Sequence, residues 1–135
     1  MDAETLKYYK HPKMQEKFRE AMGELQPGDW WISLDGYKTL TTNGNAEFAN
    51  RYEHIRLPLP IDPRNPERGL WGMMDNCSAK LRFEPWRLDK SKWSFTWHSI
   101  EEGTFHKYGE TPELALLKAL AFQWGVEVKE DDAKK

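Results

Sequence analysis

Hydrophobic residues recur at two spacings along the chain, and each spacing predicts one kind of element. From Pro12 to Met22 they recur every three or four residues, which predicts an amphipathic helix that ends at Gly23. After a turn at Pro27 and Gly28 they alternate from Asp29 to Leu34, which predicts a half-buried strand. Its apolar face is predicted to consist of Trp30, Ile32 and Leu34.

A return strand is expected directly after this first strand. Asp35 and Gly36 are typical of a hairpin turn, and the β-branched stretch from Tyr37 to Thr42 fits the second arm. Between Asn43 and Glu53 the pattern predicts no defined element.

The carboxy-terminal half alternates in three further stretches, which lie near residues 79–84, 93–98 and 104–108. They predict a three-stranded antiparallel meander with one apolar face. A helix follows, with Thr111 as its cap, Pro112 as its first residue and Gly125 as its stop. The predicted class is therefore α+β, with the meander covered on one face by the long carboxy-terminal helix and with an amino-terminal amphipathic helix.

The carboxy-terminal helix is apolar on most of its circumference, with only Lys118 and Gln123 interrupting. Two interpretations remain open: burial between the meander and the amino-terminal helix, or one flank that forms a subunit interface. Residues 126–128 are predicted to add a short edge strand. We expect one domain over residues 1–128 and a disordered tail over 129–135.

The segment from Arg56 to Met74 contains four prolines, which exclude helix and central strand over most of its length. It is predicted to be an extended connector. Asn65 is then expected to cap a short helix that begins at Pro66 and continues to Met74.

Composition restricts the partners. The 135 residues carry a net charge of −2, which provides no field to attract nucleic acid or an anionic membrane. Cys77 is the single cysteine, so no intrachain disulfide forms, and a reducing compartment is expected. Neither a secretory signal nor a spanning helix is recognisable. We expect a soluble cytoplasmic protein that does not bind a membrane and carries no cofactor, and nucleic-acid binding is kept only as an alternative.

No common catalytic or phosphate-binding motif occurs in the chain, so we predict no catalytic residue, although the sequence alone does not exclude an enzyme. One pair of possible metal ligands remains. If residues 101–103 form the loop between the last two strands, His98 faces His106 at about 5 Å between Cβ atoms. The alternative, which we prefer, is two unrelated histidines on a polar face, because no third ligand is fixed nearby.

Two arginines are candidates for anion binding. Arg64 and Arg68 surround the start of the short helix, where they could hold a phosphate or carboxylate. The alternative is that they pair with Asp62 and Glu67 and hold the connector against the body of the protein, and this is the interpretation we prefer.

The chain contains seven tryptophans, and alternation assigns them to different faces. Trp93, Phe95 and Trp97 share one strand face, which fits either a stacking platform or, as we prefer, a core under the carboxy-terminal helix. Trp31 and Trp86 are predicted to point the other way. With Arg82 and Arg87 they form the candidate interaction surface.

Three segments together resemble a family: QPGDWW, RLPLPIDPRNPERGLWGM and ETPELALLKALAFQWGVEV. The chain resembles small uncharacterised proteins encoded in bacteriophages and prophages of Gram-positive bacteria, over about Phe18 to Val128. The carboxy-terminal part is also loosely similar to the phage α-β sandwich domains. The resemblance implies no functional residue, because it implies no activity.

The favoured hypothesis is a non-enzymatic phage or prophage accessory protein in the bacterial host cytoplasm. It is expected to act by binding an unidentified protein partner or by self-association. A small-molecule or nucleic-acid binder that uses the exposed tryptophans and arginines is a second hypothesis, and a metal-dependent enzyme at the two histidines is a third.

Overall fold

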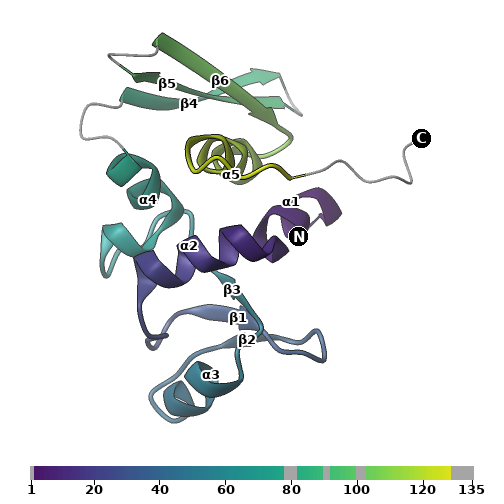
Figure 1. The fold of residues 1–135 in the computed structure, drawn as a ribbon, viewed down its shortest axis with the longest axis vertical. Helices are drawn as coiled ribbons and strands as arrows, with labels where there is room; N and C mark the ends of the chain where they lie inside the picture. Colours follow the sequence, from purple (N-terminus) through teal and green to yellow (C-terminus); the bar gives the residue numbers. More distant parts are fainter. Residues whose placement is uncertain (1, 78–81, 90–91, 100–102, 129–135) are drawn as a thin grey trace.

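The α+β class is confirmed by a computed structural model, which describes residues 2–77, 82–89, 92–99 and 103–128. For residues 82–89, 98 and 99 it describes the backbone alone. Two small antiparallel sheets lie at opposite ends of the molecule, with most of the helices between them (Figure 1). The expected tail at 129–135 lies outside the described residues.

Two helices begin the chain: α1 (Ala3–Lys10) and α2 (Pro12–Met22). The second has the predicted bounds, and Gly23 caps it at φ 67°. The first was not predicted. It starts where the Asp2 carboxylate accepts a hydrogen bond from the Thr5 N–H at 2.7 Å, and it stops at His11, whose extended backbone precedes Pro12.

The first sheet has the strand order β2-β1-β3, formed by β1 (Trp30–Ile32), β2 (Lys38–Leu40) and β3 (Ile55–Leu57). Helix α3 (Ala46–Tyr52) connects β2 to β3. The outer edge of β3 is occupied by a side chain: the Gln15 amide accepts from the Arg56 N–H at 2.7 Å and donates to the Arg56 carbonyl at 2.9 Å. Gln15 thereby satisfies a buried strand edge.

The proline connector leads into two short helical pieces rather than the single predicted helix. A 3₁₀ turn, η1 (Pro66–Arg68), is capped by Asn65, whose side-chain oxygen accepts from the Glu67 N–H at 3.2 Å. Gly69 then takes an extended conformation, and α4 (Leu70–Cys77) follows. The prediction was right about the cap and wrong about continuity.

The second sheet has the order β4-β5-β6, formed by β4 (Arg82–Asp89), β5 (Lys92–Ser99) and β6 (Gly103–Gly109). The predicted start of the first of these strands, at 79–81, lies outside the described residues. Helix α5 (Pro112–Gln123) is capped by Thr111, whose hydroxyl accepts from the Leu114 N–H at 3.1 Å. Residues 126–128 form no strand, contrary to expectation.

Helix α5 lies against one face of the second sheet and also contacts α1 and α4 (Figure 1). Phe95 and Trp97 are buried beneath it, which agrees with the core interpretation of that strand face. On its other side the Tyr9 hydroxyl donates to the Glu113 carboxylate at 2.7 Å and so ties α1 to α5. None of the helices in the described part of the chain has the length and apolar character needed to cross a membrane.

Candidate functional site

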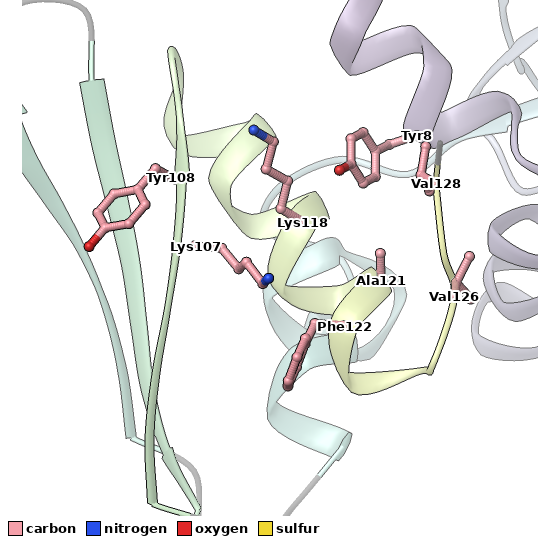
Figure 2. A pocket seen from close by; sticks show the side chains of 8 residues that line it. All are labelled: Tyr8, Lys107, Tyr108, Lys118, Ala121, Phe122, Val126 and Val128. Atoms are coloured by element: carbon pink, nitrogen blue, oxygen red, sulfur yellow. The ribbon is translucent and has the colours of Figure 1, made fainter. Parts of the chain in front are cut away.

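A cleft of about 390 Å³ opens between α1, β6 and α5. Figure 2 shows the side chains that surround it. Its lining joins an apolar base to basic groups and the Tyr8 ring, while the Tyr108 ring points away from α5 (Figure 2). The lining residues are Tyr8, Lys107, Tyr108, Lys118, Ala121, Phe122, Val126 and Val128.

Two lysines supply the charge of this cleft. The Lys107 ammonium lies 4.8 Å from the centre of the Phe122 ring, and the Lys118 ammonium lies 3.1 Å from a carboxylate oxygen of Glu4. The Glu4 and Lys118 side chains are 41% and 24% exposed, so water competes with their ion pair. The Lys118 ammonium can therefore turn toward a bound anion at little cost.

The aromatic wall of the cleft is the Phe122 ring, which other aromatic side chains hold in place. The Phe122 ring is 44% exposed on its open side. On the protein side it contacts Phe105 and Trp97, at 5.1 and 5.8 Å between ring centres. The Trp97 indole N–H in turn donates to Gln123 at 2.9 Å. A flat apolar group would meet a pre-arranged surface here.

The two arginines predicted as an anion site are occupied by carboxylates of the chain itself. Arg64 donates to Asp62 and to Asp29, with its Nη2 at 2.7 and 2.6 Å from their oxygens. Arg68 is 4% exposed, and it donates to both oxygens of Asp29. It also donates to the backbone carbonyls of Met22 and Glu24, at the end of α2 and in the turn that follows. This arrangement supports the ion-pairing interpretation.

The ion-pair partners differ from those expected. Asp62 was predicted, but the second partner is Asp29 rather than Glu67. Asp29 directly follows the Pro27-Gly28 turn, and its carboxylate also accepts from the Gln26 N–H at 2.7 Å. The sequence offered one indication of this role: an acidic residue at the start of an apolar strand.

Electrostatics keeps both carboxylates of this cluster ionised. Burial alone raises the pKa of Asp29, but hydrogen bonds from Arg68, the Gln26 N–H and Arg64 outweigh it, and the pKa lies below the ordinary value. The pKa of Asp62 is lowered in the same way against the effect of burial, mainly by Arg64. We call these four residues, Asp29, Asp62, Arg64 and Arg68, the ion-pair cluster.

The structure does not pair the two histidines as predicted. His98 pairs with Thr104, and His106 pairs with Thr96, because the strands are shifted by two residues from the predicted register. The His106 ring is hydrogen-bonded to the Thr96 hydroxyl at 2.8 Å. Within the described residues no group of three or more metal-ligating side chains comes together.

The predicted tryptophan surface is wrong at Trp31, which is 2% exposed. Its ring packs against Phe48 of α3, at 6.4 Å between ring centres, because α3 covers the strand face that alternation had assigned to solvent. Leu34, predicted to lie on the apolar face of the first strand, is 80% exposed. The other three members, Arg82, Trp86 and Arg87, lie on β4, where the side chains are outside the described part.

Cys77 has no feature of a nucleophile. Its thiol donates to the Met73 carbonyl at 3.3 Å, and burial raises its pKa. A raised pKa lowers the thiolate fraction near neutral pH.

Several large apolar side chains of the first sheet, its β1–β2 hairpin and α3 are exposed. Eight such side chains are exposed in the described part of the chain, and six of them lie between residues 34 and 61. We call five of these the aromatic end: Leu34, Tyr37, Leu40, Phe48 and Tyr52. The sequence analysis missed this surface because the stretch before Glu53 gave no pattern.

No family model, curated protein or solved structure matches the chain. The residues themselves are therefore the basis for assigning a function.

Proposed function

We propose that the chain is a non-enzymatic accessory protein, encoded in a phage or prophage, that binds another protein or a second copy of itself. The observation that carries this proposal is the concentration of exposed apolar side chains in residues 34–61. Clustered apolar groups on a soluble surface are typical of contact sites, and aromatic residues contribute most to such contacts.

The aromatic end replaces the surface proposed from alternation. Phe48 and Tyr52 lie one turn apart on α3, with ring centres 4.7 Å apart and exposures of 57% and 54%. Trp31 supports the Phe48 ring from below. A supported aromatic pair loses little side-chain freedom when a partner covers it, which favours binding.

The edge strand β2 belongs to the same end of the molecule. No strand in the described part pairs with its outer side, so its backbone is available for pairing with an added strand. Leu40 lies on it, and Asn45 donates to the Leu40 carbonyl at 3.1 Å, which limits that pairing to the rest of the strand. Side-chain contacts at Phe48 and Tyr52 are therefore the main basis of the proposed binding.

Within this proposal the two halves of the molecule have different tasks. The meander, covered on one face by the carboxy-terminal helix, is not part of the proposed contact surface. The first sheet with α3 is the half that meets the partner in the bacterial cytoplasm.

The proposal is tested with Phe48→Lys combined with Tyr52→Lys, because lysine on exposed helix positions keeps the fold and opposes apolar contact. Wild type and variant are used as bait in an extract of the bacterial host, and retained proteins are quantified by mass spectrometry. Self-association is followed by sedimentation velocity. We expect the variant to lose a partner, or the dimer, that the wild type holds.

Tyr108→Lys is the control, since the Tyr108 side chain is 44% exposed, lies on the second sheet and points away from the cleft (Figure 2). It should bind as the wild type does. Equal binding by wild type and by the doubly substituted α3 variant would remove the aromatic end as the contact surface.

A further inference from the structure

We propose that the cleft between α1, β6 and α5 binds a small molecule that joins a carboxylate to a flat apolar body. The volume of about 390 Å³ lies at the lower end of the range for small-molecule sites, roughly 300–1,000 Å³. This size fits a compact aromatic acid. The cleft is on a different part of the molecule from the aromatic end, so the two proposals stand independently.

Among the residues that the structure describes, the charged side chains that line the cleft are both basic. They are Lys107 and Lys118, and they come from different elements, β6 and α5 (Figure 2). The nearby carboxylate of Glu4 holds Lys118 in a partly exposed pair. A ligand carboxylate can take the place of Glu4, because the pair has little net stability in contact with water.

The apolar part of the cleft is already formed. The Phe122 ring presents an open face and is held by Trp97 and Phe105, while Ala121 and Val126 are almost fully buried beside it. The Lys107 ammonium near the ring shows that this face already attracts a cation. A ligand with an aromatic ring next to its carboxylate would contact the Phe122 ring and the Lys107 ammonium together.

Free aromatic acids share this chemistry with the carboxyl terminus of a peptide that ends in phenylalanine. The experiment therefore titrates ¹⁵N-labelled protein with 2-naphthoate and, separately, with N-acetyl-alanyl-phenylalanine, and follows amide signals by NMR. Naphthalene-2-methanol serves as the uncharged counterpart. We expect shifts at residues 107, 118, 121 and 122 with an acid, and binding at least about tenfold weaker with the alcohol.

Lys107→Gln combined with Lys118→Gln should weaken binding of the acid by about tenfold or more, since a charge-assisted contact is lost. Lys13→Gln combined with Lys17→Gln removes the same total charge from α2 and should leave binding unchanged. The proposal is supported if either acid binds, loses affinity in the Lys107/Lys118 variant and keeps it in the Lys13/Lys17 variant. The acid that binds more tightly shows whether the ligand is a free aromatic acid or the carboxyl terminus of a peptide. Binding of neither acid, or equal loss in both double variants, overturns it.

Discussion

Arg68 donates to both carboxylate oxygens of Asp29, from Nη1 to Oδ1 at 2.9 Å and from Nη2 to Oδ2 at 2.6 Å. The two residues are 39 positions apart and both almost fully buried. Through Asp29 the start of the first strand is held to the connector, and through the carbonyl of Met22 the end of α2 joins them. The ion-pair cluster thus fixes the place where three segments meet.

Arg68→Ala should lower the free energy of unfolding by about 3–5 kcal/mol, because it leaves the buried Asp29 carboxylate without its main counter-charge. Urea denaturation followed by circular dichroism measures the change. Arg51→Ala, at an exposed position of α3, is the control and should change stability by about 0.5 kcal/mol or less. Equal stability of both variants would show that the cluster contributes little.

Stability should fall in acid because the folded state lowers the pKa of Asp29 and of Asp62. At low pH the unfolded chain takes up protons on these groups before the folded chain does, so protonation favours unfolding. The contribution is present in full above about pH 5 and is lost as the pH falls below about 4 toward the folded-state pKa values. Asp29→Asn should be less stable at neutral pH and should show a flatter acid slope. Identical slopes in both proteins would contradict this origin.

Tyr9 should make the protein sensitive to alkali. Burial, and then the neighbouring Glu113 carboxylate, raise the pKa of Tyr9 well above its ordinary value. The unfolded chain therefore loses this proton near pH 10 while the folded chain retains it, and stability falls as the pH rises further. Tyr9→Phe should cost about 1–2 kcal/mol at pH 7 and should reduce the alkaline loss, as measured by urea denaturation from pH 7 to pH 11. An unchanged alkaline slope would rule out Tyr9 as its cause.

Gln15→Ala should weaken the first sheet at its β3 edge, since it leaves the N–H and carbonyl of Arg56 and the carbonyl of Tyr9 without a described partner. Each unsatisfied buried group costs about 1–3 kcal/mol. Hydrogen exchange at the Arg56 amide is the specific measurement and should accelerate. Gln26→Ala, at an exposed position, should leave that rate unchanged. Unaltered protection in the Gln15 variant would mean that another group covers this edge.

Gly72→Ala should destabilise the junction between η1 and α4. A Cβ atom at this position would lie 1.9 Å from the backbone carbonyl oxygen of Pro66, so the backbone must move. We expect a loss of at least about 2 kcal/mol in thermal or urea unfolding. Gly44→Ala is the matched control, because its nearest neighbour would be the Thr42 hydroxyl at 3.9 Å. Similar stability of the two variants would contradict the close approach.

The sequence predicted best those helices that begin and end at recognisable capping residues. Helix α2 lies between a proline and Gly23, and α5 follows Thr111 and Pro112, so their caps could be read directly. Helix α1 has only Thr5 and Tyr9 buried, and α3 only Ala49. Such helices depend on tertiary contacts and have no strong periodicity to detect.

The errors at the candidate sites have a common physical cause. Alternation separates the two faces of a strand but does not show which face is covered. The face that carries Trp31 is buried because α3 packs on it. The histidine pairing failed because strand register depends on the position of the connecting loop. Ser99 rather than Ile100 is the last paired residue of β5, and this one-residue displacement of the loop shifts every pairing partner by two. Asp29 was missed because its partner Arg68 is 39 residues away, beyond any local pattern.

Site-specific photo-crosslinking at position 48 tests the central claim most directly. A benzophenone amino acid replaces Phe48 in one protein and Tyr108 in another, and both are irradiated inside bacterial cells of the kind that the proposed function requires as host. The proposed function predicts a discrete crosslinked species from position 48, either with a second copy of the chain or with one other protein, and none from position 108. The absence of a species specific to position 48 would contradict binding through the aromatic end.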